Sequence, residues 1–113
     1  MKISSLYICV CDMNRAVGFY EELFDRPVTE KDDIYSVFDI DGFRFGLFAF
    51  EKKNEPHTFG SNCLPSISFA NLEELNNKLT GKQVCFPLTL IGKNWVAEIN
   101  DSEGNRIELT APC

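Results

Sequence analysis

Hydrophobic positions at the start of the chain change from a period of two to a helical period. Residues 3–11 alternate along the chain, which predicts a strand with one buried face. The residues expected on its core face are Leu6, Ile8 and Val10, and those expected on the opposite face are Ser5, Tyr7 and Cys9. Apolar residues then recur at helical spacing as far as about Asp25, Asp12 can cap this helix, and Pro27 prevents its continuation.

Two alternating runs follow the helix. The runs 34–40 and 43–50 flank the dipeptide Asp41-Gly42, and Asp-Gly between alternating apolar runs is a strong hairpin signal. A further short strand is expected near 27–32. The first half of the chain is therefore predicted to have the order β-α-β-β-β.

The second half repeats this order. The run 63–71 predicts a strand, Asn71 can cap a helix with Glu74 as its capping-box partner, and Gly81 closes a stripe of leucines. Three more strands are expected from the sequences QVCFPLTLI, NWVAEIN and NRIELTA. The segments GFRFGL and GNRIEL both follow a turn and share Gly, Arg and Leu, which indicates a duplicated module.

Composition limits the kinds of protein to which this pattern belongs. The chain has 113 residues, 44% of them hydrophobic, and shows neither a membrane span nor a secretory signal, so we expect one domain in the cytoplasm. The net charge is −6 and no basic cluster is present, so nucleic acid is not an expected partner. Five cysteines without a C-x-x-C pair, mostly among apolar residues, predict reduced, buried thiols. They are Cys9, Cys11, Cys63, Cys85 and Cys113.

The stretches DMNRAVGFYEELF and DSEGNRIELTAP together resemble the glyoxalase I / bleomycin-resistance protein / extradiol dioxygenase superfamily, also called vicinal oxygen chelate (VOC) proteins. Ile99 stands where the family usually has an aromatic residue, and Ser102-Glu103 where it has Pro-Asp. The resemblance implies an α+β fold in which two βαβββ modules form a half-barrel cleft. As a single VOC domain the chain would comprise module one at about 1–51, a linker at about 52–62 and module two at about 63–113.

The resemblance also implies where a metal ion would be held. Metal enzymes of the family place one ligand on the first and the last strand of each module. Spacing to the expected caps and turns puts these positions at Ser5, Gly46, Leu64 and Glu108. Only Glu108 retains a ligand type, and a divalent cation needs several converging donors, so neither a metal nor another cofactor is expected.

Other polar residues have two interpretations each. His57, the only histidine, is expected to be a solvated residue of the linker. Alternation directs Glu108 to the concave face, where it is either a solvated or Arg-paired carboxylate or a catalytic group. Glu98 and Asp39 occupy equivalent places in the two hairpins and could also line that face, as an acid-base pair or as solvated residues.

Aromatic residues suggest a ligand surface. Tyr7, Phe48 and Phe50 are predicted to share the strand faces of Ser5 and Gly46, giving a wall suited to a flat apolar or aromatic ligand. The alternative is that these rings only pack against one another. Tyr35 and Trp95 complete the aromatic set. The full set of expected ligand-binding residues is Ser5, Tyr7, Phe48, Phe50, Trp95, Glu98 and Glu108.

These observations favour a metal-free protein that binds a small organic molecule, and the acidic composition favours a cationic one. The resemblance implies a homodimer similar to drug-sequestering proteins of the bleomycin-resistance type. One alternative is a metal-dependent enzyme, of the lactoylglutathione lyase or dioxygenase type, with Glu108 as its base. Another is a purely structural dimeric module with a filled cavity.

Overall fold

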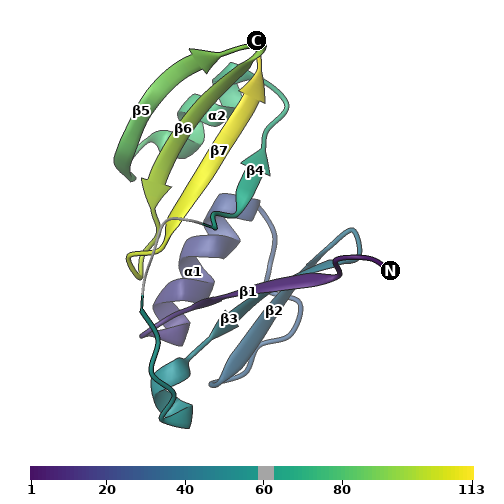
Figure 1. Cartoon of the computed structure of the whole chain (residues 1–113), viewed down its shortest axis with the longest axis vertical. Coiled ribbons are helices and arrows are strands. Elements are labelled where there is room, and N and C mark those ends of the chain that lie inside the picture. The colour runs from purple at the N-terminus through teal and green to yellow at the C-terminus, as the bar shows by residue number, and fades with distance from the viewer. Residues whose placement is uncertain (59–62) are drawn as a thin grey trace. The chain divides into compact units, whose positions relative to one another are not determined.

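Each half of the chain folds as an open sheet with one helix on one face (Figure 1). The computed structural model describes residues 1–58 and 63–113, and the chain divides into two units, Met1–Phe59 and Gly60–Cys113. The first unit contains β1 (Ser5–Cys9), α1 (Met13–Phe24), β2 (Tyr35–Ile40), β3 (Phe43–Phe48) and the 3-10 helix η1 (Phe50–Lys53). The second contains β4 (Ser66–Ser68), α2 (Leu72–Leu79), β5 (Gln83–Ile91), β6 (Asn94–Asn100) and β7 (Arg106–Pro112). This α+β architecture confirms the predicted fold class.

Helix α1 begins and ends where the sequence predicts. The Asp12 side chain accepts a hydrogen bond from the backbone N–H of Arg15 at 3.0 Å, which caps the first turn. Asp25 ends the helix in the left-handed conformation, with φ 53°. The buried face is an apolar stripe consisting of Met13, Ala16, Val17, Tyr20 and Leu23. Tyr20 reaches the sheet, with its ring centroid 5.1 Å from that of Phe45.

The first unit has the strand order β1-β3-β2. Strands β2 and β3 form the predicted hairpin around Asp41 and Gly42, both of which have the positive φ that this tight turn requires. Strand β1 lies parallel to β3, and the crossover between parallel neighbours contains α1.

The short strand predicted near 27–32 is reduced to one isolated bridge between Glu30 and Val37. Beyond Glu30 the Asp32 carboxylate accepts hydrogen bonds from the backbone N–H groups of Ile34 and Tyr35, at 2.9 and 3.2 Å. These bonds turn the chain into β2, so pairing does not extend further.

The second unit has the same plan with one more strand, in the order β4-β7-β6-β5. The side chain of Asn71 accepts from the backbone N–H of Glu74 at 2.9 Å, and the Glu74 carboxylate accepts from that of Ala70 at 3.1 Å. The core lies between α2 and the sheet. Its buried apolar residues are Leu75, Ala97, Ile99, Ile107, Leu109 and Ala111.

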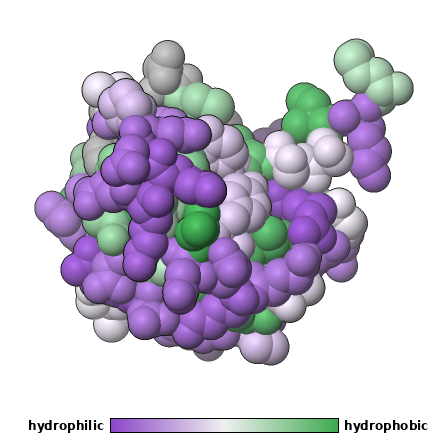
Figure 2. All heavy atoms as spheres, turned by 90° about the horizontal axis from the view of Figure 1, so that it is seen from below, coloured by the Kyte–Doolittle hydropathy of each residue, from purple (hydrophilic) through white to green (hydrophobic). Residues whose placement is uncertain are grey.

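The cysteines differ from the prediction. All five lie in described parts of the chain and none is in a disulfide, but four are exposed and only Cys9 is half-buried. Cys9 lies on the sheet face opposite the helix, and Cys85 lies in the edge strand β5, so apolar neighbours in sequence did not bring burial. Most of the surface drawn in Figure 2 is hydrophilic, with small apolar groups between. Neither helix of the described residues has the length and apolarity to cross a membrane.

Candidate functional site

Three aromatic side chains lie on the open face of the first sheet, the face away from α1. Strand register pairs Tyr7 with Gly46 and Tyr35 with Phe48, so these residues share one side. The ring centroid of Tyr7 is 5.5 Å from that of Phe48 and 6.2 Å from that of Tyr35, in edge-to-face geometry. We call Tyr7, Tyr35 and Phe48 the ring face.

Gly46 lies at the centre of the ring face because a side chain there would collide with Tyr35. A Cβ atom at position 46 would be 2.1 Å from the Tyr35 hydroxyl oxygen and 2.5 Å from Cζ. The Tyr35 phenol therefore occupies the space into which the side chain of any other residue at position 46 would project. Burial raises the pKa of Tyr35, although the nearby Arg44 guanidinium opposes this, so the hydroxyl remains a hydrogen-bond donor at neutral pH.

Arg44 forms the charged end of the same face. Its guanidinium pairs with Glu30, and Nη1 lies 3.7 Å from the Asp39 carboxylate. Asp39 also accepts a hydrogen bond from the backbone N–H of Gly42 at 2.9 Å. Its role in the structure is therefore to hold the hairpin and to pair with Arg44.

His57 packs against aromatic rings, which corrects the prediction of a solvated linker residue. Its ring centroid lies 5.3 Å from that of Phe50, 5.8 Å from that of Phe48 and 6.5 Å from that of Tyr7. The backbone N–H of Glu55 donates to the carbonyl of Phe50, and this turn brings the segment back over the sheet. No pattern in the sequence indicated this return.

One nitrogen of the His57 imidazole lacks a hydrogen bond within the described part of the chain. Among the described residues Nε2 has no hydrogen-bond partner although it is buried, and the Glu55 carboxylate oxygen lies 3.7 Å away. That separation exceeds a hydrogen bond and permits only a charge interaction when His57 is protonated. His57 is therefore held by ring packing, and it covers part of the surface that a ligand of the ring face would contact.

Phe50 does not extend β3 as predicted. The strand ends at Phe48, and the backbone N–H of Lys52 donates to the carbonyl of Ala49 at 3.0 Å to begin η1. The 3-10 turn directs Phe50 inward, where it is buried beside His57. Phe50 supports the ring face from this position.

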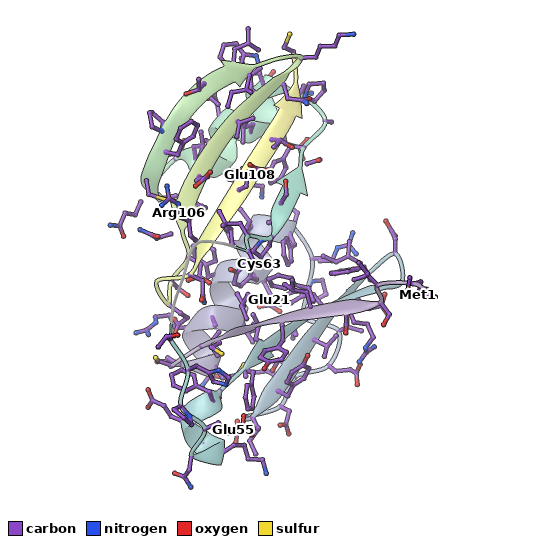
Figure 3. All side chains as sticks on the ribbon, viewed as in Figure 1. Met1, Glu21, Glu55, Cys63, Arg106 and Glu108 are labelled. Atoms are coloured by element: carbon purple, nitrogen blue, oxygen red, sulfur yellow. The ribbon has the colours of Figure 1, made fainter. Side chains whose placement is uncertain are left out.

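The open face of the second sheet carries a group of polar side chains on β4, β6 and β7. Register aligns Ser66 with Glu108, and Glu108 with Glu98, on neighbouring strands. The Ser66 hydroxyl donates to the Glu108 carboxylate at 2.6 Å, and Arg106 Nε donates to the Glu98 carboxylate at 2.6 Å. Arg106 and Glu108 project from β7 (Figure 3). Glu108 is thus a hydrogen-bonded carboxylate on an open sheet face.

Trp95 lies on the other side of this sheet. It pairs with Ala111, next to the pair Ala97 and Leu109, and these three partners are buried toward α2. Trp95 and Glu98 are three residues apart on β6, so strand alternation separates them. Trp95 and Glu98, both among the expected ligand-binding residues, therefore lie on opposite faces of β6.

In the observed register, two of the four predicted metal positions do not lie directly opposite their partners. Tyr7, not Ser5, lies opposite Gly46, and Ser66, not Leu64, lies opposite Glu108. Ser5 pairs instead with Arg44, and Leu64 precedes β4. Their assignment to one metal centre came from spacing to the helix caps and turns and not from strand pairing, so it stays a prediction.

The residues at these positions and directly opposite them do not fit a divalent metal. Gly46 offers no donor and is covered by the Tyr35 ring, while Ser66 is a neutral hydroxyl bonded to Glu108. Where the chain is described, no group of three or more His, Cys, Asp and Glu residues could hold a metal ion. A catalytic divalent ion needs about three protein donors.

Each unit has one helix and a first strand that lies parallel to its last. A known protein family shares this arrangement. A model of the Glyoxalase/Bleomycin resistance protein/Dioxygenase superfamily matches residues 2–109. The chain belongs to this superfamily. A comparison with curated proteins gave no match.

Solved structures of the glyoxalase superfamily share the fold at low identity. A glyoxalase/bleomycin resistance protein/dioxygenase family enzyme from Burkholderia phytofirmans PsJN has 16% identity and a TM-score of 0.81, with both chains covered fully. A glyoxalase/bleomycin resistance protein from Albidiferax ferrireducens T118 has 18% identity and a TM-score of 0.81, covering 97% of this chain and 98% of its own. A lactoylglutathione lyase from Agrobacterium tumefaciens has 16% identity and a TM-score of 0.71, covering 97% and 92%.

Because Tyr35 lies so close to Gly46, we expect the substitution Gly46→Ala to destabilise the wild-type protein but to stabilise a Tyr35→Ala variant. Gly46→Ala should lower the free energy of unfolding by about 1 kcal/mol or more, because the ring must leave its position. In a Tyr35→Ala background the same substitution should stabilise by about 0.5 to 1 kcal/mol, since alanine restricts the unfolded strand more than glycine. Urea denaturation measures both effects, and equal effects in the two backgrounds would contradict this geometry.

The donor set predicts that this glyoxalase-superfamily chain carries no stoichiometric Zn, Ni, Fe or Mn. The test is elemental analysis of protein purified without a metal-affinity tag. We expect far less than one such ion per chain, because a tight site needs about three converging donors. Near-unit occupancy by any of these metals would show that the ligand positions are assigned wrongly.

Proposed function

We propose that this glyoxalase-superfamily protein binds a small, flat organic molecule on the ring face and uses no metal in doing so. The observation that carries the proposal is the edge-to-face cluster on the sheet face opposite α1, which His57 covers in part and in which Tyr7 is 49% and Tyr35 is 38% exposed. Large exposed aromatic side chains lose little conformational entropy when a ligand stacks on them. The centroid separations are those of rings that pack against one another, and Tyr7 and Tyr35 each keep part of their surface exposed.

The charge of the molecule favours a cationic ligand. Aromatic ring faces carry partial negative charge and attract cations within about 6 Å. The net charge of −6 adds a long-range attraction for such ligands. Within the first unit, Ser5 is proposed as a neighbour of the ring face. Within the second unit taken by itself, Glu98 and Glu108 are proposed as contacts for a cation on the open face of its sheet.

An enzyme of the lactoylglutathione lyase or dioxygenase type is the alternative function. Such an enzyme would need donors that Gly46 and Ser66 do not supply. Glu108 could still act as a base, but its hydrogen bond from Ser66 occupies one carboxylate oxygen. The geometry therefore supports binding more than metal-assisted catalysis. A purely structural module would show no response to any ligand.

The assembly and location remain predictions. A homodimer is proposed because β5 is an edge strand that carries three exposed apolar side chains, and unpaired edges invite association. These side chains are Val84, Leu90 and Ile91. A cytoplasmic location and the absence of nucleic-acid partners are likewise proposed from composition alone.

Two phenylalanines on β3 provide a matched test. Phe48 lies on the ring face, whereas Phe43 pairs with Ile40 on the opposite side and is 38% exposed. Phe48→Ala should weaken binding of proflavine, a planar cation, by about 2-fold to 10-fold, which corresponds to about 0.5 to 1.5 kcal/mol for one lost aromatic contact. Phe43→Ala should leave the affinity unchanged.

Fluorescence titration measures these affinities, and acridone serves as a neutral planar comparison. The wild-type chain should bind proflavine more tightly than acridone because of the ring faces and the net charge. Equal losses of proflavine affinity in Phe48→Ala and Phe43→Ala would show that the ring face is not the binding surface. A complete absence of binding and of thermal stabilisation by either probe would favour the structural module instead.

A further inference from the structure

His57 packs on two of the three rings that a ligand of the ring face would contact. Its ring centroid lies 6.5 Å from that of Tyr7 and 5.8 Å from that of Phe48, and both contacts are edge-to-face. A third contact, at 5.3 Å, is with the buried ring of Phe50 in η1. Only 26% of the His57 side chain is exposed, although it lies in the loop after η1. The imidazole therefore occupies ring surface that a flat ligand also needs.

The turn before His57 brings the imidazole to this position. Asn54 ends η1 in the left-handed conformation, and the backbone N–H of Glu55 then donates to the carbonyl of Phe50 at 3.2 Å. This hydrogen bond is two residues before His57. The imidazole is joined to the backbone through two rotatable bonds, so it can leave the rings by a change of rotamer while the turn stays formed.

Packing on the rings leaves one nitrogen of this imidazole without a hydrogen bond. Nε2 is buried and has no hydrogen-bond partner among the described residues, and the Glu55 carboxylate oxygen is 3.7 Å away. A buried polar atom without a partner destabilises the conformation that buries it, because the atom has lost its hydrogen bond to water. Ring packing therefore favours this position of His57, and the buried nitrogen opposes it.

The burial of Nε2 also distinguishes two possible roles of His57 in ligand binding. While the imidazole packs on the rings, Nε2 is inaccessible and cannot bond to a ligand. A flat ligand that stacked on Tyr7 and Phe48 in place of the imidazole would return this nitrogen to water. We propose that His57 is an autoinhibitory cover of the ring face and that a flat ligand binds by displacing it. This inference rests on the proposed binding of flat ligands at the ring face.

Two substitutions of His57 should change the affinity for proflavine in opposite directions. A cover lowers the apparent affinity in proportion to the fraction of chains that are uncovered. His57→Ala removes the cover and should raise the affinity by about 3-fold to 10-fold, the range expected for one aromatic contact. His57→Phe keeps a ring but has no nitrogen to bury, so it should cover the rings more tightly and lower the affinity by about 2-fold to 5-fold. A residue that instead formed a wall of the binding site would give the reverse order.

Nuclear magnetic resonance can observe the displacement directly, because His57 is the only histidine of the chain and its imidazole signals are unambiguous. In the free protein the imidazole protons should show nuclear Overhauser effects to the rings of Tyr7 and Phe48. At saturating proflavine these effects should disappear, and effects from proflavine to the same two rings should replace them. Imidazole effects that persist in the bound protein would overturn the cover.

The affinities are measured on the full chain by fluorescence titration, and circular dichroism verifies that each variant is folded. Thr58→Ala, at an exposed neighbouring residue, is the matched control and should leave the affinity unchanged. Equal affinities of the wild-type chain and both His57 variants, or the reverse order, would overturn the cover while ring-face binding stands. Binding by His57→Ala alone would support both proposals. Binding by none of these proteins would overturn both.

Discussion

In both units the first strand lies parallel to the last, and this pairing determines the side on which each functional residue lies. Parallel neighbours require a long crossover, which here contains α1 in one unit and α2 in the other. Each helix buries one sheet face and leaves the other uncovered. The centre of the open face is then the strand pair itself, Tyr7 with Gly46 in the first unit and Ser66 with Glu108 in the second.

The two units use the same positions for different chemistry. In the second unit the pair is a hydroxyl donating to a carboxylate, so the side chains satisfy each other. In the first unit the glycine leaves space that the Tyr35 ring fills, which brings three aromatic rings within 6.2 Å of one another. A catalytic metal site would need about three protein donors. In the first unit, the missing donor on β3 and the packing of the Tyr35 ring over the sheet both follow from Gly46.

Most of the fold was predictable because it depends on local signals. Caps at Asp12 and Asn71, the Asp41-Gly42 turn and strand alternation each act within a few residues, and the structure confirms all of them. Register was less predictable, because counting from a helix cap does not determine which residues pair. Ser5 and Leu64, assigned by spacing to the helix caps, therefore lie two residues from the residues that pair with Gly46 and Glu108.

The site was predicted only in part, since long-range packing completes it. Tyr7 and Phe48 follow from alternation alone, but the return of His57 over the rings depends on a 3-10 turn that hydrophobic periodicity does not reveal. Trp95 is different, because strand alternation already separates it from Glu98. Burial of the cysteines was also not predictable from local sequence. Apolar neighbours indicated buried thiols, but Cys9 on the open sheet face is only half-buried and Cys85 in the edge strand is exposed.

Nuclear magnetic resonance of the isotope-labelled chain, titrated with proflavine, examines the ring face most directly. Resonances of Tyr7, Tyr35, Phe48 and the Gly46 amide should shift together along one saturation curve, because they share one uncovered surface. Phe38 and Phe45, on the helix side of the same strands, should change little. Shifts confined to the helix side, or no shifts at saturating probe, would contradict the proposal that this protein binds flat ligands on its ring face.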